Sequence, residues 1–172
     1  MNPAALGGTA APVPLTAEHD TSQFVCRHDS LSVWLSKRAM ANAASGASRT
    51  YVVCAPESQV IGYYALSAGS IAAASVAGRL RRNMPDPLPV IVLGRLAVHT
   101  DWAGRGVGGG LLKDAVLRAI QASALIGVRA ILCHAIDEEA MGFYLKHGFV
   151  SSPLDPLTLM LGLQTGVEFS RP

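Results

Sequence analysis

The chain has 172 residues, of which 50% are hydrophobic and 15% are charged, and its formal net charge is +2. This length predicts a single domain over residues 1–172, because domains usually have ~100–200 residues. The order of the predicted elements covers about residues 12–163, which we expect to form its core. The low charge content excludes intrinsic disorder for most of the chain, and no apolar run reaches the ~20 residues of a membrane span.

The beginning of the chain has few structural signals. Residues 1–20 are rich in Pro, Ala and Gly and are expected to be irregular, and residues 1–15 lack the basic stretch of a signal peptide. A helix is predicted to follow and to end at Gly46. The side chain of Asp29 or Ser30 is expected to accept hydrogen bonds from the amides of its first turn.

The next stretch predicts a β-hairpin. Residues 50–55 and 60–66 are rich in β-branched and aromatic side chains, and the turn-forming residues 56–59 separate them. Residues 71–83 are rich in alanine with a basic end, and both a helix and an extended conformation stay open for them. A cluster of prolines at 85–89 predicts a break.

The second half predicts a strand–helix–strand unit with parallel strands, over residues 90–135. Its first strand, 90–98, is nearly all apolar, as in a strand buried on both faces. Its helix begins near Val107 and has a polar face. That face is expected to carry Lys113, Asp114, Arg118 and Gln121.

Three elements complete the predicted order. They are a strand at 128–135, a helix at 137–146 with acids in its first turn, and a last strand at 157–163. The order describes one mixed α/β domain.

The three cysteines, Cys26, Cys54 and Cys133, form neither a zinc pattern nor a CxxC pair. We therefore expect no metal site and no disulfide framework, in the reducing environment of the cytoplasm. Cys54 and Cys133 fall in predicted strands and are expected to be buried there, without the partners of a nucleophile.

The segment from Trp102 to Gly110 is the main chemical signal. A strand, a glycine-rich loop and a helix N-terminus form an anion site, because several unpaired amides point at one place. The lysine of a nucleotide-binding P-loop is absent, and the loop starts too far beyond the strand for a dinucleotide fold.

Two strings, one in this segment and one further along the chain, resemble motifs of the GNAT superfamily of N-acetyltransferases. The loop reads Arg105-x-x-Gly108-x-Gly110, and a later string reads Phe143-Tyr144-x-x-x-Gly148-Phe149. The resemblance implies a GNAT fold, with a mostly antiparallel mixed sheet, a splayed central strand pair and flanking helices. It also implies acetyl-CoA as co-substrate. The residues that it assigns to acetyl-CoA are Leu96, Ala97, Val98, Arg105, Gly106, Val107, Gly108, Gly109, Gly110 and Phe143.

Other segments resemble one bacterial subgroup, the GNAT toxins of toxin–antitoxin systems of the TacT and AtaT type. Examples are Leu31-x-x-Trp34-Leu35, the segment 62–66 and the segment 93–98. This resemblance implies acetylation of the α-amino group of aminoacyl-tRNA, which stops translation. The implied partners are a ribbon-helix-helix antitoxin, operator DNA through the antitoxin complex, and a second copy in a homodimer, whose surface we expect around 60–77 and 154–167.

Tyr144 is the catalytic residue that the toxin resemblance implies. Its hydroxyl is protonated at neutral pH and can donate to the leaving thiolate, although a core aromatic residue on a helix face fits the spacing too. No general base is evident. His134, Glu138 and Glu139 are more readily explained as structural residues, and an α-amino group with a pKa of about 7.7–8.0 needs little help from a base.

The basic residues Arg79, Arg81, Arg82 and Arg95 are the candidate contacts for the tRNA acceptor stem. A charge run is usually a solvated loop, but three arginines within four residues favour binding here, and Arg95 lies inside a predicted strand. The alternative function is acetylation of a small-molecule amine, which predicts an acidic pocket, and a non-enzymatic binding protein would not need the loop and Tyr144. Trp34 and Trp102 are expected to be packing residues.

Overall fold

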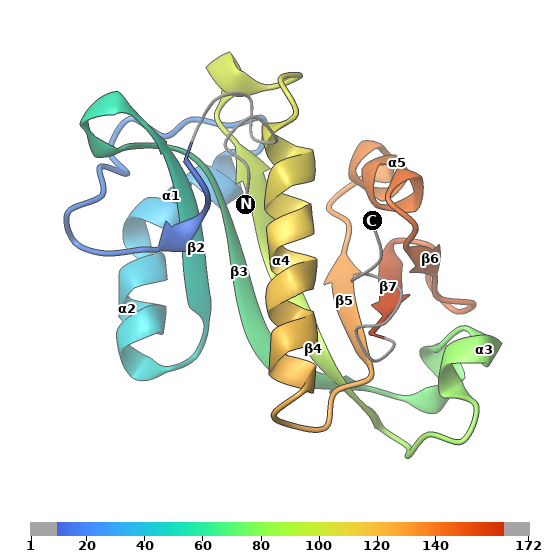
Figure 1. Cartoon of the computed structure of the whole chain (residues 1–172). Helices are drawn as coiled ribbons and strands as arrows, with labels where there is room; N and C mark the ends of the chain where they lie inside the picture. Colours follow the sequence, from blue (N-terminus) through green and yellow to red (C-terminus); the bar gives the residue numbers. More distant parts are fainter. Residues whose placement is uncertain (1–9, 164–172) are drawn as a thin grey trace. The chain divides into compact units, whose positions relative to one another are not determined.

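The structure is a computed structural model that describes residues 10–163 (Figure 1). Within them, a seven-stranded sheet has the order β1-β2-β3-β4-β5-β7-β6. Strands β4 and β5 pair in parallel, whereas β1–β2, β2–β3, β5–β7 and β6–β7 pair antiparallel. The predicted mixed, mostly antiparallel sheet is therefore confirmed. The strands are β1 (Val13–Pro14), β2 (Arg49–Ala55), β3 (Gln59–Ile71), β4 (Leu88–Val98), β5 (Ala130–His134), β6 (Val150–Ser151) and β7 (Thr158–Gly162).

The chain divides into two compact units. Unit 1 comprises Met1–Ser67 and Gly94–Ala115, and unit 2 comprises Ala68–Leu93 and Val116–Pro172. Strands β3 and β4 and helix α4 (Val107–Ser123) each begin in one unit and end in the other. Three regular elements therefore carry the chain between the units.

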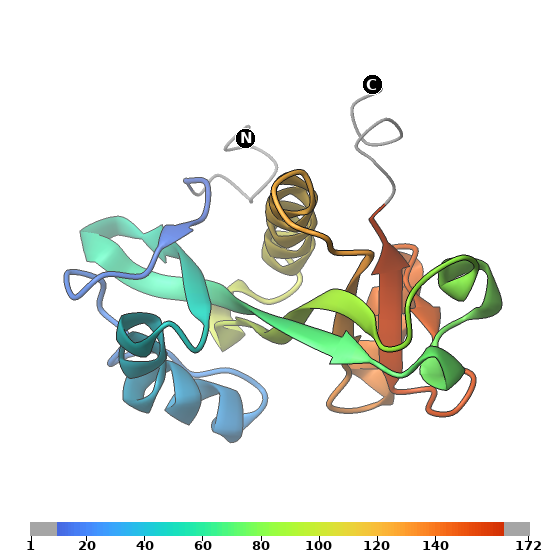
Figure 2. The same cartoon turned by 90° about the horizontal axis from the view of Figure 1, so that it is seen from below.

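Unit 1 has helices on both faces of its strands (Figure 2). Helices α1 (Asp29–Lys37) and α2 (Ala39–Ser45) cover one face, where Trp34 packs in the same apolar core as Tyr63. The first turns of α4 cover the other face, where they approach Gly62. Successive residues of a strand point to opposite faces, so β3 serves both layers.

The helix predicted to end at Gly46 is two helices, which meet at Arg38. The residue that precedes the first helix is His28, and no side chain caps it. The expectation that Asp29 or Ser30 accepts hydrogen bonds from the first turn is wrong, because both residues already lie inside that turn. The break places Ala39, which is fully buried, in the same core as α1. The end at Gly46 is confirmed, with a φ of 80°.

The hairpin is confirmed as β2 and β3, joined by a 3-10 turn at Pro56–Ser58. The second strand is longer than predicted and extends to Ile71. The segment left open at 71–83 is neither one helix nor one extended stretch. It contains a second 3-10 turn, Ala73–Ser75, and the short helix α3 (Gly78–Arg81).

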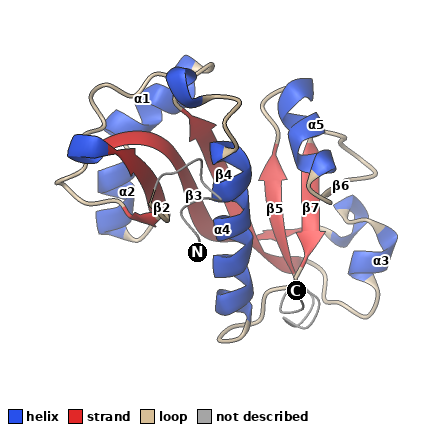
Figure 3. Cartoon of the chain, turned by 45° about the horizontal axis from the view of Figure 1, so that its top comes forward, coloured by secondary structure: helices blue, strands red, loops and turns tan. Residues whose placement is uncertain are grey.

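Unit 2 is built on β5, β7 and the first half of β4, with α3 and α5 (Glu138–Lys146) beside them (Figure 3). The register of β4 and β5 runs from Val90↔Ala130 to Leu93↔Cys133, which confirms the predicted parallel pair. Local patterning did not indicate the two-residue strands β1 and β6. The predicted break at 85–89 ends early, because β4 already begins at Leu88. One core of this unit contains Val76, Leu80, Leu88 and Met160.

Candidate active site

The end of β4 differs from its beginning in burial and in pairing. The recorded parallel pairs with β5 stop at Leu93↔Cys133, whereas β4 continues to Val98. In the first half of β4, the buried residues are Leu88, Val90, Ile91 and Leu93. Gly94 is exposed, and of the β4 residues after it only Ala97 is buried. The expectation of a strand buried on both faces therefore holds only for the first half. The second half has the partly open strand that an approaching ligand needs.

The glycine-rich loop leads from this strand end into α4. Gly104 and Gly106 have φ values of 76° and 83°, a left-handed conformation that glycine adopts without steric strain. The amide of Gly110 donates to the carbonyl of Gly106 over 3.1 Å. The amides of Val107, Gly108 and Gly109 therefore precede the first amide that donates within the helix, and they form its positive end. This arrangement suits an anion such as a pyrophosphate.

Arg105 is exposed in the same loop. Its guanidinium carbon lies 5.0 Å from the centroid of the Trp102 ring, within the range of a cation–π contact. Trp102 thus holds a cation beside the helix amides, in addition to the packing role expected for it. Arg105 reinforces the positive potential of the loop.

A buried polar pair fixes α4 on β3. The Tyr64 hydroxyl donates a hydrogen bond to a carboxylate oxygen of Asp114, and both residues are buried. The assignment of Asp114 to the polar face of the helix is therefore wrong. Asp114 lies two helical turns after Val107, on the buried side, and the helical period contained this signal. The residue type was misleading, because a carboxylate is rarely buried without a partner.

Tyr144 lies in unit 2 on α5, the helix that follows β5. The Asp137 side chain accepts a hydrogen bond from the amide of Ala140 over 2.8 Å, which starts α5 in the predicted place. The Tyr144 ring is 7% exposed and contacts the rings of Phe143 and Phe149. No hydrogen-bond partner of its hydroxyl occurs among residues 10–163. The structure therefore leaves this hydroxyl available to a bound molecule.

Burial raises the pKa of Tyr144 well above its ordinary value, and the nearby Cys133 thiol adds to the effect. The hydroxyl is therefore protonated across the physiological pH range and can act only as a proton donor there. Burial also raises the pKa of Cys133 to about 12, and it raises the pKa of Cys54. A thiol of such high pKa is a poor nucleophile, which agrees with the structural role predicted for both cysteines, although Cys54 is only half-buried.

Each of the weaker candidates for a general base has either a hydrogen-bond partner or a position that a structural role explains. Nδ1 of His134 lies 2.9 Å from the hydroxyl of Thr158, and that hydroxyl donates to Asp155. Glu138 and Glu139 are exposed in the first turn of α5, where negative charge suits the helix dipole. The structure thus favours the structural interpretation of these three residues.

The candidate tRNA residues fall into two groups. Arg79, Arg81 and Arg82 are exposed on α3 and directly after it, in unit 2. Between them Leu80 is buried in the core of that unit, and the Asp86 carboxylate accepts from the amide of Ala73 over 3.0 Å. The basic segment is therefore a structured turn with its arginines outward.

Arg95 belongs to unit 1 and is half-buried. Its guanidinium carbon lies 4.3 Å from the centroid of the Trp34 ring, which itself stacks on Tyr63 at 5.9 Å. This contact fixes the direction of the cation. Phe143, the remaining candidate for acetyl-CoA, is half-buried on α5, and its ring lies 4.7 Å from that of His147.

Residues 10–163 contain neither a candidate metal site nor a candidate membrane span. No group of three or more His, Cys, Asp or Glu side chains lies where it could hold a metal ion. No helix in that part of the chain is long and apolar enough to cross a membrane.

Comparison with known proteins gives consistent matches. The family profile described as the acetyltransferase (GNAT) domain matches residues 47–151. A Mycobacterium tuberculosis protein named as a tRNA-acetylating toxin is 49% identical over 156 residues, which cover 91% of this chain and 93% of the relative. A structure of AtaT with acetyl-methionyl-tRNAfMet is 26% identical, covers 92% of this chain and 97% of its own, and superposes with a TM-score of 0.84. A mutant of AtaT bound to the C-terminus of the antitoxin AtaR and acetyl-CoA is 25% identical, covers 94% and 98% of the two chains, and has a TM-score of 0.80.

Proposed function

Since the chain belongs to the GNAT acetyltransferases, we propose that it transfers the acetyl group of acetyl-CoA to the α-amino group of aminoacyl-tRNA and so acts as a toxin that blocks translation. The observation that carries the proposal is the 49% identity to a tRNA-acetylating toxin over 91% of the chain. The exposed anion loop and the protonated Tyr144 support it, because acetyl transfer from a thioester needs both kinds of group.

The acetyl-CoA site is assigned to the end of β4 and the loop after it. Acetyl-CoA supplies a thioester whose acetyl group is transferred. The positive end of α4 and Arg105 suit its pyrophosphate, and the partly open end of β4 supplies backbone groups for its pantetheine arm. The assigned residues are Leu96, Ala97, Val98, Arg105, Gly106, Val107, Gly108, Gly109 and Gly110, with Phe143 from α5.

Tyr144 is assigned the role of general acid. When the amine nitrogen bonds to the acetyl carbon and the carbon–sulfur bond breaks, the Tyr144 hydroxyl donates its proton to the leaving sulfur. Because burial raises the pKa of Tyr144, the hydroxyl keeps its proton until it donates that proton to the leaving sulfur. The amine attacks in its neutral form, a substantial minority at neutral pH for an α-amino group of pKa about 7.7–8.0. After attack its nitrogen loses a proton to solvent, and Tyr144 regains a proton from solvent.

The arginines suit the phosphates of tRNA. The turn that carries Arg79, Arg81 and Arg82 is fixed to the core by Leu80. The backbone of this turn is therefore already ordered before tRNA binds. Arg95, oriented by Trp34, is assigned to the same substrate. The alternative, acetylation of a small-molecule amine, is less well supported, because the candidate substrate contacts Arg79, Arg81, Arg82 and Arg95 are basic.

The partners proposed for this chain follow its relatives. One AtaT–AtaR complex is bound to DNA, although that structure is only 24% identical to this chain and shows the fold alone. We assign to this chain a ribbon-helix-helix antitoxin, operator DNA through that antitoxin, a cytoplasmic location and a single folded domain. The burial of the described residues reduces the part of 60–77 and 154–167 that is available for the proposed homodimer surface. Residues 60–65 are buried in the chain itself, whereas Leu154 is 68% exposed, and residues 164–167 lie outside the described part.

The test is acetyl transfer from labelled acetyl-CoA to a pool of charged tRNAs. We expect label on the aminoacyl group, and its loss when the ester-linked amino acid is removed before the assay. Label on small amines but not on tRNA would overturn the tRNA assignment and leave the acetyltransferase. An unlabelled pool with no acetyl-CoA consumption would overturn the enzymatic function itself.

A further inference from the structure

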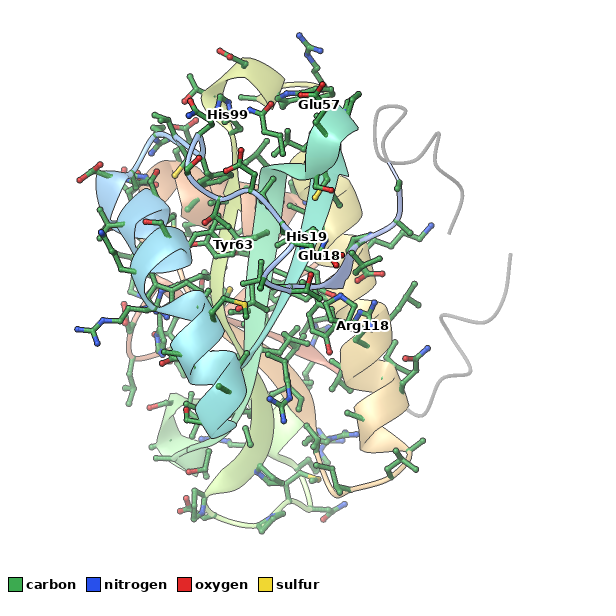
Figure 4. All side chains as sticks on the ribbon, turned by 90° about the vertical axis from the view of Figure 1, so that its left-hand side faces the viewer. Glu18, His19, Glu57, Tyr63, His99 and Arg118 are labelled. Carbon is green, nitrogen blue, oxygen red and sulfur yellow. The ribbon has the colours of Figure 1, made fainter. Side chains whose placement is uncertain are left out.

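His99 follows the last residue of β4 and is 8% exposed (Figure 4). Its ring packs edge-on against Phe24, with the ring centroids 5.9 Å apart. The resemblance assigned no role to this residue, and its position next to the acetyl-CoA segment of β4 makes its contacts relevant to that site.

Both ring nitrogens of His99 are in use. Nδ1 accepts a hydrogen bond from the amide of Asp101 over 3.0 Å, and Nε2 lies 3.1 Å from the carbonyl oxygen of Gln23. A backbone amide only donates and a carbonyl only accepts. Nδ1 must therefore hold the lone pair and Nε2 the hydrogen, which describes one neutral tautomer.

The backbone of His99 and Thr100 adds hydrogen bonds to two other segments. The amide of His99 donates to the carbonyl of Ile61 in β3 over 2.7 Å, and the amide of Thr100 donates to Val25 over 2.9 Å. The carbonyl of His99 accepts from the amide of Trp102 over 2.8 Å, which closes the 3-10 turn Thr100–Trp102. His99 thereby ties β3 and the segment before α1 to the turn from which the glycine loop starts.

We propose that His99 is a positioning residue for the pyrophosphate of acetyl-CoA, acting through the turn Thr100–Trp102 on the loop that follows it. The inference rests on the proposed acetyl-CoA site. The turn carries Trp102, which holds Arg105, and it is followed within two residues by Gly104. A loop with two left-handed glycines has many alternative conformations, so its entry point decides how much of the population has the binding geometry.

The physical effect is on affinity for one part of the ligand. Apparent affinity falls in proportion to the fraction of molecules in the competent conformation. Loss of the hydrogen bond between Nδ1 of His99 and the Asp101 amide is therefore expected to raise the KM for acetyl-CoA. It leaves kcat nearly unchanged, because His99 does not touch the group that protonates the sulfur.

Three substitutions separate the two bonds. In His99→Asn the side-chain oxygen takes the place of Nδ1 and can accept from Asp101, as asparagine does at helix starts. In His99→Gln the side-chain amide reaches toward Gln23 in place of Nε2, and the acceptor for Asp101 is lost. His99→Leu removes both bonds and keeps an apolar side chain of similar size.

The experiment measures steady-state kinetics of the full chain with acetyl-CoA and with S-acetylpantetheine, which lacks the pyrophosphate. With acetyl-CoA we expect KM to rise about tenfold in His99→Leu and His99→Gln, and less than about threefold in His99→Asn, with kcat within about twofold. With S-acetylpantetheine we expect all four proteins to have the same kcat/KM.

Two results would overturn the inference. An equal loss of kcat/KM with both donors would show that His99 supports the fold in general. An unchanged KM for acetyl-CoA in His99→Leu would show that the turn does not control the loop. Calorimetric titration of the wild-type chain with acetyl-CoA distinguishes this failure from that of the proposed site, because absence of binding would overturn both.

Discussion

Tyr144 and Tyr63 are both buried tyrosines, but their hydroxyls differ. The Tyr63 hydroxyl donates to the carbonyl of Leu31 over 2.7 Å, whereas the Tyr144 hydroxyl has no hydrogen-bond partner among residues 10–163. The absence of such a partner in this part of the chain supports the proton donation proposed for Tyr144. At the scale of single residues, this contrast distinguishes Tyr63, which has a structural hydrogen bond, from Tyr144, for which we propose catalysis.

The first prediction concerns these two hydroxyls. We expect Tyr144→Phe to lower kcat about 100- to 10,000-fold, because a positioned general acid contributes that much, with little change in KM for acetyl-CoA. We expect Tyr63→Phe to leave kcat unchanged but to lower the free energy of unfolding by about 1 kcal/mol through the lost hydrogen bond. Acetylation of charged tRNA and urea unfolding measure the two effects.

The pH dependence of kcat checks the same assignment. The pKa of Tyr144 is raised, so its proton is lost only above the ordinary tyrosine value of about 10. The acid form is therefore present throughout the range below that pH, and the rate should show no alkaline decline from this group there. A decline centred near pH 8, absent in Tyr144→Phe, would contradict the protonated state that burial imposes.

At the scale of elements, α4 is held on β3 by a close approach as well as by the Tyr64–Asp114 pair. A Cβ added at Gly62 would lie 2.9 Å from Leu111 and 3.2 Å from Val107. Those distances are shorter than ordinary van der Waals contacts, so the packed side chains of Leu111 and Val107 would have to shift to admit a Cβ. The position of the anion site therefore depends on a residue outside the glycine loop.

The second prediction compares two glycines. We expect Gly62→Ala to lower the free energy of unfolding by about 1–3 kcal/mol through overpacking against α4. Gly142→Ala in α5 is the matched control, since its added Cβ meets nothing within 4 Å and alanine favours a helix by up to about 1 kcal/mol. Urea unfolding of both variants decides the matter, and equal stability of the two would refute the close-approach argument.

At the scale of the whole molecule, the formal charge of +2 is too small to attract RNA by itself. Phosphate contacts must therefore be local, and the exposed arginines of the α3 segment are the densest cationic group in the sequence. A surface of this kind gives affinity that falls with salt in proportion to the number of phosphates contacted.

The third prediction is a change in salt dependence. In the triple variant Arg79→Gln, Arg81→Gln, Arg82→Gln, we expect the slope of log K against log salt for tRNA to flatten by about 2 to 3, at ~0.7–0.9 per phosphate. Filter binding over a salt series measures it. The control variant Lys37→Gln, Arg38→Gln, Lys113→Gln removes the same charge from exposed positions. An equal flattening there would mean that general charge, not the α3 segment, binds the RNA.

Much of this molecule was predictable from its sequence because the signals are local. Alternating and helical periodicity identified the hairpin, the parallel strand pair and α4 and α5, and the loop residues 105–110 with the string 143–149 indicated the family. These features depend on neighbours in the chain, so they are readable before folding.

Only the tertiary structure decided the features that depend on partners distant in sequence. The break at Arg38, the burial of Asp114 against Tyr64 and the two-residue strand β1 all arise from contacts across the fold. The role of His99 has the same origin, since its partner Gln23 lies 76 residues away. A polar residue predicts exposure by default, and only the folded chain supplies the hydrogen-bond partner that makes its burial favourable.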